Sequence, residues 1–161
     1  MQDLLIKIYK NKRFSLFLHL LSLAVSLLCV LMLGAHLAIL LYRSEYANAA
    51  VIATSLFVGF VLVSLVRKAI DAPRPYELYD FYEDKPKERE GRSFPSRHAY
   101  SAFSIATAAF ALHPVFGASF ILLAALMCAS RVLLGIHFIR DVACGALLGI
   151  IAGGAALIFV M

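Results

Sequence analysis

The sequence predicts an all-α membrane protein, a polytopic bundle of about five transmembrane helices with one long polar loop. Hydrophobic residues make up 62% of the 161 residues, and the mean hydropathy is +0.85. A soluble domain of this size is much less apolar, so the composition indicates an integral membrane protein. The apolar residues are gathered into long stretches without charge, as membrane-spanning helices require. We expect residues 1–161 to form a single domain.

Two uncharged stretches near the N-terminus, Phe14–Leu41 and Tyr46–Val66, predict the first two spans. The first stretch is long enough to tilt or to project beyond the bilayer. Basic residues precede it, as in a signal peptide, but its apolar run is too long for the apolar core of such a peptide. We therefore expect an uncleaved span.

The segment from Arg67 to Arg97 predicts the polar loop. It carries eight Lys or Arg residues, seven Asp or Glu residues and four of the five prolines. Such a segment cannot lie in lipid, because its charges and backbone groups would lose their contact with water. A loop of this length usually has a function.

The uncharged region between Arg97 and Arg131 predicts two spans. As one helix it would be roughly 50 Å long at ~1.5 Å per residue, whereas the hydrocarbon core is only about 30 Å thick. His113-Pro114 lies at its middle, and proline interrupts helices. We therefore expect spans at Ala99–Leu112 and Val115–Ser130, joined by a tight turn. The first of these is short and can start below the membrane surface.

A last span is expected from about Phe138 to Met161. Gly145, Gly149 and Gly153 recur in it at intervals of four residues. This spacing either allows another helix to pack closely against the span or reflects the ordinary composition of membrane helices.

Five spans place the N-terminus, the polar loop and the turn before the last span on one membrane face. Every basic residue except Arg43 then lies on that face. The net charge of +5 is expected to meet membrane phosphates or an anionic substrate and not nucleic acid. The positive-inside rule would make this face cytoplasmic.

Polar residues that could carry chemistry fall into three clusters on this face. The first is Arg67, Lys68 and Arg74, the second is Ser96, Arg97 and His98, and the third is Arg131, His137 and Asp141. His137 and Asp141 are four residues apart, so on a helix they share a face and can hydrogen-bond. Such a pair is either a reactive imidazole oriented by a carboxylate or a structural pair. Guanidinium groups match phosphate oxygens, and two histidines can supply a nucleophile and an acid or base.

In this arrangement the sequence resembles the type-2 phosphatidic acid phosphatase superfamily, which also includes vanadium haloperoxidases. The motif P-S-x-H is met by Pro95-Ser96-Arg97-His98. The motif S-R-x-x-x-x-x-H-x-x-x-D is met in full from Ser130 to Asp141. In the motif K-x-x-x-x-x-x-R-P, Arg67 replaces the lysine, and Lys68 is the close alternative. The resemblance covers about residues 65–150; members commonly have six spans, so five would be a reduced form.

The resemblance implies hydrolysis of a phosphate ester or pyrophosphate through a phosphohistidine. It implies that His137 is the nucleophile, that Asp141 orients it, and that His98 serves as acid and then base. The phosphate-binding groups would be Arg67 or Lys68, Arg74, Ser96, the backbone N–H of Arg97, and Arg131. We expect no cofactor, because fixed guanidinium groups can stabilise the transferring phosphoryl group. A metal site at the two histidines and Asp141 is disfavoured, because the arginines would repel a cation.

A phosphate site at the membrane boundary suits an amphiphilic substrate. Candidates are phosphatidate, phosphatidylglycerol phosphate and a polyprenyl pyrophosphate. One alternative is a phosphatase or phosphotransferase for a soluble phosphate, and another is a non-enzymatic membrane protein that binds anionic lipid. We expect a multi-pass protein of the cell membrane; the family more often has its site on the extracytoplasmic face, whereas the charge distribution favours the cytoplasmic face.

Overall fold

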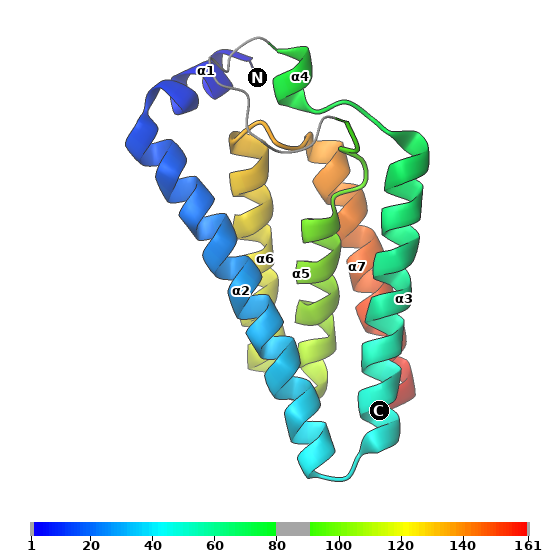
Figure 1. The fold of residues 1–161 in the computed structure, drawn as a ribbon. Coiled ribbons are helices and arrows are strands. Elements are labelled where there is room, and N and C mark those ends of the chain that lie inside the picture. The colour runs from blue at the N-terminus through cyan, green and yellow to red at the C-terminus, as the bar shows by residue number, and fades with distance from the viewer. Residues whose placement is uncertain (1, 80–90, 161) are drawn as a thin grey trace.

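The computed structural model describes residues 2–79 and 91–160, and within these residues the regular structure is helical (Figure 1). The elements are α1 (Gln2–Lys10), α2 (Lys12–Tyr42), α3 (Tyr46–Ile70), α4 (Pro75–Leu78), α5 (Arg97–Ala108), the 3₁₀ turn η1 (Ala109–Ala111), α6 (Pro114–Leu133) and α7 (Ile139–Val160). The prediction of an all-α bundle is confirmed. Residues 80–90 of the predicted polar loop lie outside the described part.

Four of the described helical segments are long and apolar enough to cross a membrane: those of α2, α3, α6 and α7. The predicted third span, Ala99–Leu112, corresponds to α5, which has 12 residues and is about 18 Å long, whereas the hydrocarbon core is about 30 Å thick. It is therefore a short helix inside the bundle. The long helices, in contrast, expose large apolar side chains, such as those of Leu31 in α2, Phe57 in α3 and Leu122 in α6, as expected for surfaces that face lipid.

The turn predicted between the third and fourth spans is present just before α6. His113 is the N-cap of α6, and its Nδ1 accepts the backbone N–H of Val115 at 3.2 Å. Pro114 occupies the first helical position, where its missing N–H costs nothing and its fixed φ suits the helix. The proline therefore starts α6 and at the same time ends the preceding helix.

The glycines of α7 allow this helix to lie directly against α5. A Cβ atom at Gly145, Gly149 or Gly153 would overlap backbone oxygens of α5, whereas one at Gly154 would meet nothing within 4 Å. Figure 1 shows the two helices side by side. Of the two interpretations of the four-residue spacing, close helix packing is the one that the structure supports.

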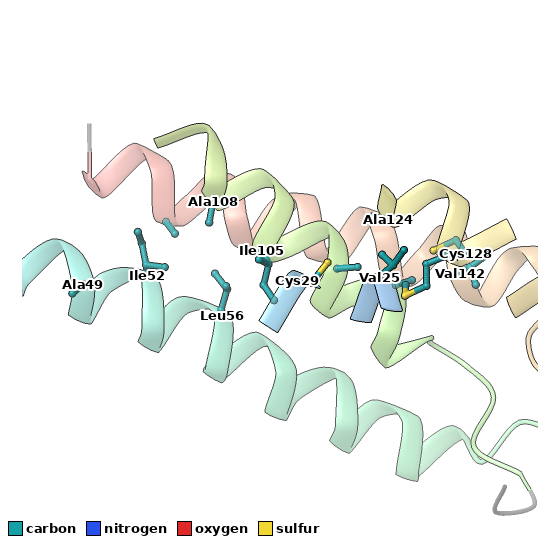
Figure 2. Close-up of a cluster of buried hydrophobic side chains, with 14 of the residues drawn as sticks. Val25, Cys29, Ala49, Ile52, Leu56, Ile105, Ala108, Ala124, Cys128 and Val142 are labelled. Atoms are coloured by element: carbon teal, nitrogen blue, oxygen red, sulfur yellow. The ribbon is translucent and has the colours of Figure 1, made fainter. Parts of the chain in front are cut away.

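The main hydrophobic core lies between the long helices and consists largely of small and medium side chains (Figure 2). The cluster includes Ile52 and Leu56 of α3, Ile105 of α5, Val25 of α2 and Ala124 of α6. Small residues let the backbones approach closely where lipid supplies no hydrophobic driving force between helices.

All three polar clusters lie at one end of the bundle. The C-terminal ends of α3 and α6 and the N-terminal ends of α5 and α7 meet there, with α4 and α1 beside them, while the turn from α2 to α3 lies at the opposite end (Figure 1). The three clusters therefore lie at the same end of the bundle, as the order of the predicted spans requires. Helix α1 was not predicted; its Leu5 packs on Tyr76, and its Ile8 packs with Leu134 and Ile136.

Candidate active site

Ser93 lies where segments of the three polar clusters meet. Its backbone N–H donates to the carbonyl oxygen of Ala72 at 2.8 Å, and its own carbonyl oxygen accepts Nη1 of Arg67 at 3.2 Å. Its hydroxyl donates to Oδ2 of Asp141 at 2.5 Å and lies 3.3 Å from Nδ1 of His137. Ser93 is fully buried. One residue thus fixes the end of α3, the connection after it and the turn before α7 relative to one another.

His137 and Asp141 lie close together, but they do not share a helix as their spacing of four residues predicts. Helix α6 ends at Leu133 and α7 begins at Ile139, so His137 lies in the turn between them. Its Nδ1 is 3.7 Å from Oδ2 of Asp141, which is too long for a hydrogen bond. That oxygen accepts the backbone N–H of Phe138 at 3.0 Å instead. The carboxylate of Asp141 therefore accepts a backbone N–H group at the start of α7. The Ser93 hydroxyl lies between this carboxylate and the imidazole of His137.

Burial and neighbouring charges keep the imidazole of His137 neutral. The side chain is 2% exposed, and burial is the main cause that lowers its pKa below the ordinary value. The positive charges of Arg67, Arg74 and Arg131 lower this pKa further, while contact with Asp141 acts in the opposite direction. Because only a neutral imidazole has a free lone pair, these effects favour the form of His137 in which a ring nitrogen has a lone pair available.

Arg67 and Lys68 have different surroundings, although they are adjacent in the chain. Arg67 is 7% exposed, and its Nη1 donates to the carbonyl oxygens of Ser93 and Pro95 at 3.2 and 3.1 Å. Lys68 is exposed on α3. Arg67 is therefore the basic residue of this pair that reaches the other clusters.

The other two arginines of the predicted phosphate site are also held by specific contacts. Arg74 is buried; its Nε donates to the carbonyl oxygen of Gly91 at 3.1 Å, and its guanidinium lies 5.6 Å from the centre of the Tyr76 ring. Nε of Arg131, at the end of α6, donates to Oγ of Ser22 in α2 at 3.0 Å. The first span, which carries no motif residue, thus positions one of the arginines.

The second cluster forms the N-terminus of α5. Ser96 is its buried N-cap, and its backbone N–H donates to the carbonyl oxygen of Asp141 at 3.0 Å. Arg97 and His98 begin the helix and are exposed, with the Arg97 guanidinium 5.8 Å from the centre of the Phe60 ring. A helix N-terminus presents unpaired N–H groups and a positive dipole end, which favour an anion.

An apolar groove leads from this helix start into the bundle. A cavity of about 330 Å³ is lined by Arg97 and His98 together with apolar residues of α2, α3, α5 and α6. It shares Val30, Phe60 and Ile105 with a second cavity of about 580 Å³ that continues between α2, α3 and α5. The two cavities therefore lie next to each other, and the smaller one borders the N-terminal end of α5.

Sequence reasoning missed Ser93, Ser22 and this groove. Ser93 lies two residues before Pro95, and this closeness to the second motif is the one sequence signal that could have pointed to it. Ser22 is a polar residue in an apolar span, and such residues usually seek a partner on another helix. The groove depends on how side chains of separate helices pack, which has no local signature in the sequence.

Comparison with known proteins agrees with this geometry. A profile of the PAP2 superfamily matches residues 48–161. The crystal structure of Aquifex aeolicus LpxE is similar, with a TM-score of 0.70 and 27% sequence identity, over 95% of this chain and 90% of that one. A search of curated proteins finds no match. Because the profile covers well over half of a chain whose helices form a multi-pass bundle, this membrane protein belongs to the PAP2 superfamily.

Proposed function

We propose that this protein hydrolyses a phosphorylated lipid through a phosphohistidine formed on His137. Membership of the PAP2 superfamily and the similarity to Aquifex aeolicus LpxE support a lipid phosphatase. The observation that carries the mechanism is the buried imidazole of His137, whose pKa is lowered by burial and by three guanidinium groups. A neutral nucleophile beside fixed positive charge is what an attack on a phosphate requires.

The reaction has two steps. A ring nitrogen of His137 attacks phosphorus while the bond to the leaving oxygen breaks, and His98 protonates that oxygen. His98 then takes a proton from water, which attacks the phosphohistidine and releases inorganic phosphate. His98 is exposed and lies beside the cavity of about 330 Å³. This position suits an acid–base residue, which must contact both the leaving oxygen and a water molecule.

Binding of the phosphoryl oxygens is assigned to the groups around His137. These are the side chains of Arg67, Arg74, Arg131 and Ser96 and the backbone N–H of Arg97. Charge develops on the oxygens in the transition state, and preorganised donors in a buried site stabilise it. Lys68 is exposed, so Arg67 is assigned the first basic position.

The groove supports a lipid over a soluble substrate. Along α2 its lining residues run from Ser26 to Leu37, which is roughly 16 Å of helix. This is about half of the ~30 Å hydrocarbon core, the depth of one leaflet. A hydrocarbon chain of a lipid in that leaflet can lie in the groove while its phosphate reaches the arginines. Phosphatidate, phosphatidylglycerol phosphate and polyprenyl pyrophosphates all have this form.

Trapping the intermediate tests the mechanism. Purified protein is mixed with ³²P-labelled lipid phosphate and quenched in alkali, in which phosphohistidine is stable. We expect label on His137 in the wild type, no label in His137→Asn, and slower formation and slower loss of label in His98→Asn, which lacks both the acid of the first step and the base of the second. Turnover without any protein-bound label would overturn the proposal.

A pair of variants on α3 tests the substrate class. Ala53 lines the groove, so Ala53→Phe is expected to raise KM for a long-chain lipid phosphate while leaving turnover of a water-soluble phosphate unchanged. Ala50 is exposed on the same helix, and Ala50→Phe is the matched control. Equal effects of Ala53→Phe on lipid and soluble substrates would favour a phosphatase for soluble phosphates.

A further inference from the structure

We infer that Ser93 is a positioning residue of this reaction, whose hydroxyl fixes His137 as the tautomer with its proton on Nδ1 and so leaves Nε2 to attack phosphorus. The inference rests on the proposed role of His137 as nucleophile. It goes beyond that role, because it names the attacking atom and the residue that selects it.

The hydrogen-bond inventory of the three side chains determines the tautomer. An ionised carboxylate only accepts, so Ser93 must donate its single proton to Oδ2 of Asp141, 2.5 Å away. The serine oxygen can then only accept from Nδ1 of His137, 3.3 Å away. A neutral imidazole has one N–H, and here that N–H is on Nδ1. Nε2 therefore keeps its lone pair.

Asp141 cannot set the tautomer directly, because its Oδ2 is 3.7 Å from Nδ1 of His137. The carboxylate instead holds the serine hydroxyl in one orientation, with the N–H of Phe138 as its second donor at 3.0 Å. The chain of contacts is carboxylate, hydroxyl and imidazole. Truncating the middle member leaves the outer two present but uncoupled.

The backbone of Ser93 is held as firmly as its side chain. Its N–H donates to Ala72 at 2.8 Å, and its carbonyl oxygen accepts Nη1 of Arg67 at 3.2 Å. The residue is fully buried. Because Arg67 is also assigned to the phosphate, the group that binds the substrate and the group that aligns the nucleophile share this one anchor.

This arrangement determines which bonds form and break in the first step and where the proton stays. The lone pair of Nε2 forms the N–P bond as the P–O bond to the leaving group breaks. The proton on Nδ1 stays in place, and the positive charge that develops on the ring is stabilised by the Ser93 oxygen and, through it, by Asp141. Hydrolysis of the N–P bond returns the lone pair to Nε2 and restores the neutral ring.

The wild-type protein provides the first test. Protein labelled with ¹⁵N-histidine is expected to show a protonated Nδ1 and an unprotonated Nε2 for His137 at neutral pH. The trapped phosphohistidine is expected to carry phosphorus on Nε2. Phosphorus on Nδ1, or a proton on Nε2 of the resting enzyme, would overturn the inference while leaving the phosphohistidine mechanism intact. A wild type that forms no phosphohistidine would instead overturn the proposed function.

Variants at Ser93 provide the second test. Loss of a group that orients a metal-ligating imidazole typically costs about 10- to 100-fold in metal affinity or activity. By analogy, Ser93→Ala is expected to lower kcat by a factor of this order with little change in KM. Ser93→Thr keeps the hydroxyl and is expected to recover part of the loss. Ser64→Ala is the matched control, because the Ser64 hydroxyl bonds within its own helix, to the carbonyl oxygen of Phe60. A kcat of Ser93→Ala equal to that of the control would refute the role; should Ser93→Ala not fold, the wild-type measurements decide.

Discussion

Replacing Gly149 with alanine tests whether the active site depends on the spacing between α5 and α7. A Cβ atom there would lie 2.5 Å from the carbonyl oxygen of Tyr100 and 2.9 Å from the backbone N of Ser104. Ordinary contacts begin at about 3.4 Å, so the two helices must separate by about 0.9 Å. The atoms met are backbone atoms, which cannot rotate away.

The expected effect is large for a single methyl group. Overpacking costs roughly 1–3 kcal/mol, and the better helix propensity of alanine returns at most about 1 kcal/mol. We therefore expect a net loss of up to about 2 kcal/mol of stability. Because α5 begins with Ser96, Arg97 and His98, its displacement moves groups of the site, and a misplacement of about 1 Å can cost about 100-fold in rate.

The assay compares Gly149→Ala with Gly154→Ala on the same helix. A Cβ at Gly154 meets nothing within 4 Å, so this control is expected to keep the wild-type activity and to gain up to about 1 kcal/mol of stability from the helix propensity of alanine. Thermal unfolding in detergent and kcat/KM for a lipid phosphate in mixed micelles are measured for both. Equal melting temperatures and equal activities of the two variants would refute the packing argument.

Three further predictions follow from the site. Arg67→Lys is expected to lower kcat/KM about 10- to 100-fold. Nη1 of Arg67 already donates to the carbonyl oxygens of Ser93 and Pro95, and lysine lacks the other guanidinium N–H groups that would bind a phosphate. Lys68→Ala is expected to stay close to the wild type, and equal losses would contradict the assignment of Arg67. The ¹⁵N signals of His137 are expected to titrate with a midpoint below the usual pKa of about 6.5, because burial and three arginines lower the pKa of this imidazole. The ring then stays neutral as the pH falls through 6.5 and takes up a proton only in more acidic solution. A midpoint at or above 6.5 would contradict this expectation. Activity is expected to survive EDTA, since guanidinium groups hold the phosphate, and a loss that Mg²⁺ restores would contradict the metal-free mechanism.

Much of the fold could be predicted because lipid imposes simple rules on the sequence. Uncharged stretches of sufficient length located α2, α3 and α7, and Pro114 located the turn before α6. The number of predicted spans between the three polar clusters then predicted that these clusters lie at one end of the bundle. Helix α1 was missed because it is short and its apolar residues pack partly on segments that are distant in the sequence, Leu5 on Tyr76 and Ile8 with Leu134 and Ile136.

The details of the site could be predicted less well, because they depend on backbone geometry. The interval between His137 and Asp141 suggests one helix, but the chain turns at Gly135, which has a φ of +66°. A positive φ suits glycine, and it separates α6 from the turn that carries His137. The pair is therefore linked by a third residue, Ser93, which lies 44 positions away from His137 in the sequence.

A crystal structure with orthovanadate, a mimic of the transferring phosphoryl group, tests most directly whether the three clusters form one phosphate site. We predict a single vanadate in contact with Arg74, His98 and His137 together. A vanadate that binds elsewhere, or that leaves one of these three side chains beyond contact distance, would contradict the account.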